Sequence, residues 1–154
     1  IDIDDAAWVF AHKWSAFYSR GKWYAVRYGP RNGGRAPMIF MHRELLGLAD
    51  GEFIDHKDRD GLNNRRTNIR RCTLSQNSAN SVRRVGVSGF RGVYKQESRR
   101  PWFVQIKHEG RQTRIGTFDT PEEAARAYYR AARELFGEFA VKNFHDKRLP
   151  RCFN

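Results

Sequence analysis

Three side chains between residues 55 and 77 are of the types needed to hydrolyse a phosphodiester bond: Asp55, His56 and Asn77. A neutral imidazole can remove a proton from water near neutral pH. Carboxylate and amide oxygens bind hard divalent cations, which stabilise negative charge on a leaving oxygen. We therefore expect His56 to act as a general base, and Asp55 and Asn77 to hold one divalent cation, Mg²⁺ or Mn²⁺.

The residues around these side chains predict a strand, a loop, a second strand and a helix. The first strand is the apolar run that ends at His56, and the second lies at residues 68–72. A helix is expected at residues 73–81, because Thr73 and Gln76 have the spacing of a capping box. Neighbouring strand residues point to opposite faces, so the carboxylate and the imidazole reach one point only if the first strand ends or bulges there. The Gly- and Asn-rich loop that follows permits such a bend.

Three motifs in this stretch resemble those of a known family. Asp-His, then Asn-Asn-Arg-Arg-Thr-Asn-Ile-Arg, then Ser-Gln-Asn follow one another within residues 43–80. They are similar to the HNH endonucleases of phages and mobile introns, which have a ββα-metal site. The resemblance implies that His56 is the general base and that Asp55 and Asn77 bind the metal. It also implies that Asn68 braces the loop through hydrogen bonds. The chain has only two cysteines, too few for the family's four-cysteine zinc variant.

Each of these residues also has an ordinary structural interpretation. An Asp-His pair on a loop is more often a surface hydrogen bond than a catalytic pair, and the asparagines at 63 and 64 are typical turn residues. Asn77 fits a solvated helix position equally well. His42, just before another predicted short helix, fits either a packing role beside the site or a donor to a phosphate. The nuclease interpretation depends on the joint order of the motifs.

Composition favours a nucleic-acid partner. The 154-residue chain carries a net charge of +12 and has a pI near 10.3, which indicates a polyanion as partner. No apolar run approaches the length of a membrane span, so we expect double-stranded DNA and no membrane. The cations nearest the predicted site are expected on the phosphate backbone, which positions a duplex without reading its sequence. They are Lys57, Arg59, Arg65, Arg66, Arg70 and Arg71.

The residues before the predicted site are expected to support it. Residues 23–28 and 37–41 read as two strands of one hairpin, joined by a Gly- and Pro-rich turn. Short helices are expected within residues 1–14 and at 43–48. The aromatic side chains of this region are expected in a core rather than as platforms for bases.

A second module follows a short basic linker. Residues 90–94, 102–108 and 112–118 predict a three-stranded antiparallel meander. A capping box with Pro121 in the first turn starts a helix that stops at Gly137. The apolar stripe of this helix, which is expected to cover one face of the sheet, comprises Ala124, Ala125, Tyr128, Ala131, Ala132 and Leu135.

The open face of that sheet is expected to read DNA, because forked donors and amides match the edges of bases. Strand alternation places Arg91, Gln105, Lys107, Gln112 and Arg114 there. The motifs Phe-Arg-Gly-Val and Ile-Gly-Thr-Phe-Asp-Thr, the helix sequence and Asn-Phe at 143–144 resemble the plant apetala-two (ethylene-response-factor) DNA-binding domain. The resemblance implies seven contact positions in the major groove: Arg91, Tyr94, Gln96, Gln105, Lys107, Gln112 and Arg114. Several of them differ from the plant residues, so the plant target sequence is not expected to apply.

The sequence thus predicts an α+β protein of two small domains: a ββα-metal (HNH) nuclease, and a three-stranded antiparallel sheet packed on one helix. We place the nuclease at residues 1–80, a linker at 81–89, the DNA-binding domain at 90–144 and a tail at 145–154. The predicted function is site-directed DNA cleavage of homing type, one strand at a time, in the cytoplasm of a bacterial host of a phage or mobile element. The alternatives are a non-catalytic DNA-binding regulator and an RNA-directed or structural phage protein.

Overall fold

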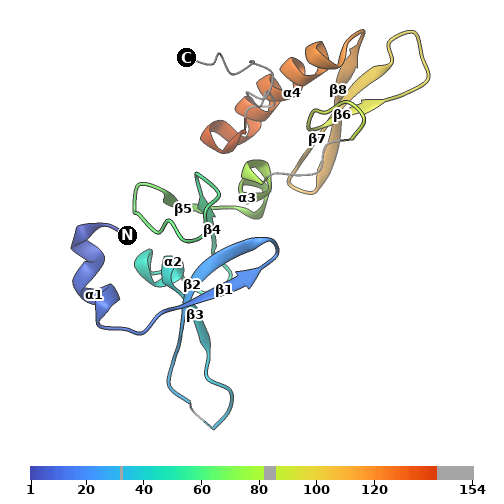
Figure 1. Ribbon diagram of the computed structural model, residues 1–154. Coiled ribbons are helices and arrows are strands. Elements are labelled where there is room, and N and C mark those ends of the chain that lie inside the picture. The colour runs from blue at the N-terminus through green and yellow to red at the C-terminus, as the bar shows by residue number, and fades with distance from the viewer. Residues whose placement is uncertain (32, 82–85, 142–154) are drawn as a thin grey trace, which may run out of the picture. The chain divides into compact units, whose positions relative to one another are not determined.

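The computed structural model describes residues 1–31, 33–81 and 86–141 of the chain. It divides into two compact units, Ile1–Asn77 and Ser78–Asn154, and the boundary falls within one helix (Figure 1). Each unit combines helices with antiparallel sheet, so the fold class is α+β. The predicted linker is described except for residues 82–85, and the predicted tail and the Asn-Phe motif lie outside the described residues.

The first unit contains two small sheets and short helices. One sheet has the order β1-β2-β3, and the other is the β4-β5 hairpin. The elements in chain order are η1 (Ile3–Asp5), α1 (Ala6–Phe10), β1 (Ser15–Ser19), β2 (Lys22–Tyr28), β3 (Met38–Phe40), α2 (Met41–Leu45), β4 (Phe53–His56), β5 (Ile69–Cys72) and α3 (Leu74–Asn80). The predicted strand, loop, strand and helix around the site are therefore present.

Strand β1 was not expected from the sequence. It pairs antiparallel with β2 over its whole length, with Tyr18 opposite Trp23. The two strands are joined by Arg20 and Gly21, which both have positive φ (49° and 82°). Such a two-residue connection matches the twist of antiparallel strands. The prediction missed it because the strand signal of β1 is interrupted by serine and alanine.

The core of the first unit is formed by α1, α2 and the β4-β5 hairpin. Its fully buried members are Val9, Met41, Leu45 and Ile69. The aromatic residues are only partly in this core, which corrects the expectation. Trp8 and Trp14 pack against it, whereas Tyr18, Trp23 and Tyr28 are each more than half exposed.

The second unit is a three-stranded antiparallel sheet covered on one face by a long helix (Figure 1). Its elements are β6 (Val93–Lys95), β7 (Trp102–His108), β8 (Arg111–Phe118), α4 (Pro121–Phe136) and η2 (Gly137–Phe139). The hydroxyl of Thr120 accepts a hydrogen bond from the backbone N–H of Glu123, and Gly137 ends the helix with a φ of 55°. The predicted meander, cap and helix end are confirmed.

The buried stripe of α4 differs slightly from the predicted one. Ala124, Ala125, Tyr128 and Ala132 are buried as expected, but Leu135 is 41% exposed. Phe136 is buried in its place, and its ring lies 5.4 Å from the ring of His108 in β7. None of the helices in the described residues is both long enough and apolar enough to cross a lipid bilayer.

Candidate active site and nucleic-acid interface

The β4-β5 hairpin positions the first two candidate residues. Asp55 lies opposite Arg70, and His56 lies opposite Ile69. The strand stays regular through His56 and ends there, because the backbone N–H of Arg59 turns back to the carbonyl of His56 (2.9 Å). The Asp55 and His56 side chains start from opposite faces of the hairpin. Of the two expected alternatives, an end or a bulge of the strand, the structure shows the end at His56.

Asp55 is buried and forms an ion pair. Its Oδ2 atom accepts hydrogen bonds from Nε (3.0 Å) and Nη2 (2.7 Å) of Arg70. Both side chains are largely removed from solvent, with exposed fractions of 5% for Asp55 and 11% for Arg70. A buried charge of this kind requires a partner, and Arg70 supplies it.

Asn77 lies in the first turns of α3. The helix begins with the predicted capping box, in which Thr73 and Gln76 exchange hydrogen bonds of 2.8 and 3.2 Å. Cys72 connects this helix with Asp55. Burial, and then the Asp55 charge, raise the pKa of Cys72 to about 11, while a hydrogen bond from the backbone N–H of Asn77 acts in the opposite direction. The Asp55 charge and the backbone N–H of Asn77 therefore both act on Cys72.

His56 is held by an asparagine of the loop. Its Nε2 atom lies 3.4 Å from Oδ1 of Asn64, and both side chains are buried. The amide nitrogen of Asn64 donates to the carbonyl of Leu62 (3.2 Å), so its oxygen faces the imidazole. An amide oxygen only accepts; Nε2 therefore carries the proton and Nδ1 is the basic nitrogen. Catalytic hydrogen bonds are often this long before a substrate binds.

Aromatic rings enclose His56 on the side of the β1-β2-β3 sheet. The ring of His42 lies 5.1 Å away and nearly perpendicular, and the ring of Tyr24 lies 6.3 Å away. Burial lowers the pKa of His56, although hydrogen bonding to Asn64 and the charge of Asp58 partly oppose this. The imidazole is therefore neutral at neutral pH, the state that a general base requires.

We expect His42 to make the protein sensitive to mild acid. Burial, together with the nearby His56, lowers the pKa of His42 from 6.5 to about 3. Unfolding would therefore bind a proton between these values, and stability is lost as the pH falls from about 6.5 toward 3. For one group this amounts to about 2 kcal/mol between pH 7 and pH 5. Urea unfolding of the protein and of His42→Leu at both pH values measures the difference. Equal losses in the two proteins would contradict the assignment.

Asn68 spans the loop between the two strands. Its Nδ2 group donates to Asp58 (2.9 Å) and to the carbonyl of Asn63 (2.7 Å), and its Oδ1 accepts from the backbone N–H of Asp58 (3.1 Å). Burial would raise the pKa of Asp58, but the hydrogen bonds from Asp60, Asn63 and Asn68 outweigh it, and the pKa is lowered. The loop that carries Asn64 is thus fixed by a network of charged and amide groups.

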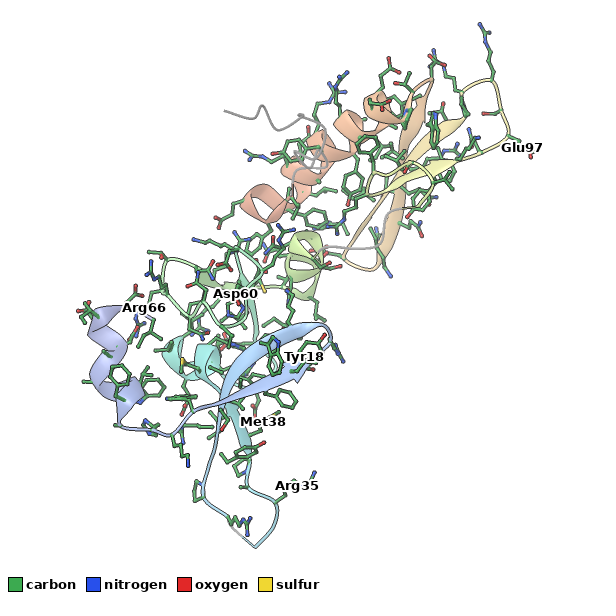
Figure 2. All side chains as sticks on the ribbon, in the orientation of Figure 1. Tyr18, Arg35, Met38, Asp60, Arg66 and Glu97 are labelled. Carbon is green, nitrogen blue, oxygen red and sulfur yellow. The ribbon has the colours of Figure 1, made fainter. Side chains whose placement is uncertain are left out.

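Most cations around the site are bound within the protein. Arg66 donates to both carboxylate oxygens of Asp5 (2.6 and 3.0 Å) and lies beside α1 (Figure 2). Arg71 pairs with Glu52, and Lys57 donates to a loop carbonyl. Arg65 is exposed. Arg66 and Arg70 thus connect their loop and strand to Asp5 and Asp55.

The open face of the second unit gathers the predicted reading residues. Gln105 pairs with Arg114, and Lys107 pairs with Gln112, across β7 and β8. A bulge between Val104 and Gln105 resets the alternation of the strands. The residues on this face are Tyr94, Phe103, Gln105, Lys107, Gln112 and Arg114.

These side chains hold one another in place. The Arg114 guanidinium lies 4.7 Å from the centre of the Phe103 ring and donates to Gln96 (2.7 Å). Phe103 in turn stacks on Tyr94, with ring centres 5.3 Å apart. Such fixed donors lose little conformational freedom when they bind, which favours a binding role.

Arg91 does not lie on this face, unlike the sequence-based expectation. It precedes β6, and its guanidinium donates to the carbonyls of Ser78, Ala79 and Ser81 at 2.6–3.0 Å. These carbonyls belong to the last turn of α3 and the residue after it, where backbone acceptors have no helical partner. The alternation of residues placed Arg91 on the sheet face because β6 was expected to begin at residue 90.

The expected divalent cation would bind at Asp55. No group of three or more His, Cys, Asp and Glu side chains is arranged to hold a metal in the part of the chain that the structure describes. Asp55 and Asn77 would supply two hard oxygen donors, and Mg²⁺ commonly binds one or two such groups together with water and substrate phosphate. A carboxylate has more lone pairs than the two hydrogen bonds from Arg70 use, so that ion pair is compatible with a cation.

Two residues of functional interest were not identified from the sequence. Asn64 looked like a turn former, and only its burial (1% exposed) and its contact with His56 distinguish it. Phe103 lies under Arg114 on the polar sheet face. The sequence did contain one signal for Phe103: it is an aromatic residue at a position where strand alternation puts polar residues.

As a class, this is a two-unit α+β protein with a buried Asp-His pair on a hairpin and a separate polar, cationic sheet. The chain belongs to the HNH endonuclease family. It is 32% identical over 143 residues to an uncharacterised HNH endonuclease of Acanthamoeba polyphaga mimivirus, an alignment covering 89% of this chain and 74% of the relative. It is also 34% identical over 94 residues to Protein 3.8 of Escherichia phage T7, covering 60% of this chain and 77% of that protein.

Residues 88–138 match the AP2 domain. This part is 48% identical over 60 residues to Ethylene-responsive transcription factor 3 of Nicotiana tabacum, an alignment that covers 36% of this chain and 25% of the plant protein. The chain thus matches about a quarter of that relative. No solved structure matches the chain.

Proposed function

We propose that the protein is a metal-dependent, site-directed DNA endonuclease of homing type. The observation that carries the proposal is the buried, neutral His56, held by Asn64 and within electrostatic reach of Asp55. Membership of the HNH endonuclease family supports the reaction class. The AP2 domain supports DNA as the substrate.

In the proposed mechanism, His56 takes a proton from the attacking water. Its Nε2–H is engaged by Asn64, so Nδ1 accepts the proton, and the lowered pKa keeps the base neutral at working pH. Asp55 and Asn77 would hold a divalent cation, Mg²⁺ or Mn²⁺, which stabilises the leaving oxygen when bound. Arg70 orients the Asp55 carboxylate, and Asn68 keeps the loop closed around the base.

The AP2 unit would bring the nuclease to its target. Its polar face presents one arginine, one lysine and two glutamines on adjacent strands, and these side chains match guanine and adenine edges in a major groove. The similarity to a phage T7 protein supports an origin in a phage or mobile element, and therefore action in the cytoplasm of a host cell. One metal per site favours cutting one strand at a time.

Incubation with a library of random DNA duplexes tests the function. With Mg²⁺ or Mn²⁺ we expect cleavage at a recurrent sequence, and sequencing of the ends gives both the site and the cut strand. With a chelator, cleavage should stop while binding persists. Cleavage that is unaffected by chelation would exclude the metal-dependent reaction.

The Asp55–Arg70 ion pair supports one alternative function. A protein whose metal ligand is permanently neutralised by Arg70 would bind DNA without cutting it, as a regulator does. Calorimetric titration with Mn²⁺ in the presence of target duplex separates the two. An endonuclease should bind the metal and lose this binding in Asn77→Ala, whereas a regulator should show no metal binding in either protein.

A further inference from the structure

The β1-β2 hairpin extends beyond the sheet to which it belongs. Strand β3 pairs only with Val26, Arg27 and Tyr28. Residues 16–25 therefore form a two-stranded ribbon whose outer part is not covered by β3, as Figure 1 shows. On one face of the ribbon Tyr18 and Trp23 lie side by side with ring centres 5.0 Å apart, and they are 57% and 52% exposed. Figure 2 labels Tyr18 on this ribbon.

The charge of this region is one-sided. Between Asp5 and Glu44 the sequence has seven basic residues and no acidic residue. Two of the seven are bound within the protein: Arg27 pairs with Glu44, and Arg43 donates to backbone carbonyls. The others include Arg20 and Lys22, which lie at the tip of the ribbon.

Arg20 occupies a backbone conformation that arginine rarely adopts. Its φ is 49°, in the left-handed region that asparagine, aspartate and glycine favour at this place in a two-residue hairpin. Placing arginine there is unfavourable for stability.

The ribbon is packed against the loop of the active site. A Cβ atom at Gly61 would overlap the backbone carbonyl of Trp23 and come within 2.7 Å of the Tyr24 ring, so only glycine fits this contact. The ring of Tyr24, the next residue of the ribbon, lies 6.3 Å from the ring of His56. The tip therefore lies beside the place where the scissile phosphate would bind.

We propose that the β1-β2 ribbon enters the major groove of the duplex directly beside the cleavage site. Arg20 and Lys22 bind phosphates flanking the scissile bond, and Tyr18 and Trp23 contact base edges and thymine methyl groups. Paired strands about 4.8 Å apart fit a major groove about 12 Å wide. The nuclease unit thus has a DNA interface of its own, separate from the AP2 sheet. This inference rests on the proposed function, since it requires duplex DNA as the substrate.

Arg20→Asn is the decisive variant, because stability and binding should change in opposite directions. Asparagine relieves the turn, so the melting temperature should rise, whereas loss of a charged phosphate contact should weaken duplex binding about tenfold. The slope of log affinity against log salt should fall by about 1. Binding is measured in a His56→Ala background without metal, on a duplex containing the cleavage site. Hydroxyl-radical footprinting should show lost protection next to that site alone.

Two matched controls isolate the effect. Glu109 and Gly110 connect β7 and β8 with almost the same backbone angles (48° and 80°), so Glu109→Asn relieves a comparable turn without removing a cation. Arg126→Gln removes an exposed cation from α4, the helix that covers the opposite face of the AP2 sheet. Both should bind like the reference. Equal binding by Arg20→Asn and the reference would overturn the inference alone, whereas a reference that binds no duplex would overturn the proposed function as well.

Discussion

The His56→Ala protein is expected to bind its target duplex and to cleave it about 10²- to 10⁴-fold more slowly than the unaltered protein, the usual contribution of a positioned general base. The imidazole is buried, neutral and oriented by Asn64, so its loss removes the proton acceptor without removing a cation that contacts DNA. Single-turnover cleavage with Mg²⁺ measures the rate, and a mobility shift without metal measures binding.

A second variant at position 56 distinguishes loss of the base from loss of folding. Because alanine leaves a cavity, His56→Gln serves as a second variant that keeps an amide donor for Asn64 but has no basic nitrogen. We expect it to be as inactive as His56→Ala and nearly as stable as the unaltered protein. His12→Gln, a histidine bonded to the carbonyl of Trp8 in α1, should retain full activity. Cleavage by both His56 variants at an undiminished rate would remove this residue from the mechanism.

Gly92→Ala is expected to destabilise the AP2 unit by about 3 kcal/mol or more. The residue has a φ of +68°, where a side chain is strained by about 1–2 kcal/mol. The added methyl group would also overlap the Tyr128 ring and lie 2.8 Å from the carbonyl of Gln105, and such overpacking costs about 1–3 kcal/mol. Hydrogen exchange of the full chain should show faster exchange in β6, β7 and β8, with the β4-β5 hairpin unaffected.

Gly116→Ala provides the matched control for this substitution. Its Cβ atom would meet only the Phe118 ring at 3.5 Å, an ordinary contact, and its φ does not favour glycine. Stability should change by no more than about 0.5 kcal/mol. The functional consequence should also differ: Gly92→Ala should lose cleavage at the recurrent site, and Gly116→Ala should retain it. Unchanged hydrogen exchange in Gly92→Ala would contradict this prediction, because it would show that the unit accommodates the added methyl group without loss of stability.

Local sequence signals predicted the elements that depend on near neighbours. The capping residues Thr73 and Thr120 form their hydrogen bonds as expected, because a cap involves residues only a few positions apart. Strand alternation placed Gln105, Lys107, Gln112 and Arg114 on one face, apart from the local adjustment at the bulge. Signals of this kind failed where they were weak: β1 was missed, and the start of β6 was set too early.

The sequence could not predict which partner each polar side chain has. Arg66 and Arg70 belong to a run of cations typical of a DNA-binding surface, yet one binds Asp5 and the other binds Asp55. Asp5 is 61 positions away from Arg66, and no local pattern records such a pairing. The same is true of Arg91, whose acceptors are carbonyls that become available only because a helix ends nearby.

By itself, the sequence of this protein determined the two-module organisation, the strand and helix order around Asp55, His56 and Asn77, and a strong preference for a polyanion. Composition, motif spacing and helix caps can be read from the sequence, because they do not depend on contacts between distant parts of the chain. The tertiary structure alone decided that His56 contacts Asn64 and that the β1-β2 ribbon packs against Gly61 of the loop. Those contacts join residues from different elements, and their energies depend on burial, which exists only once the chain has packed.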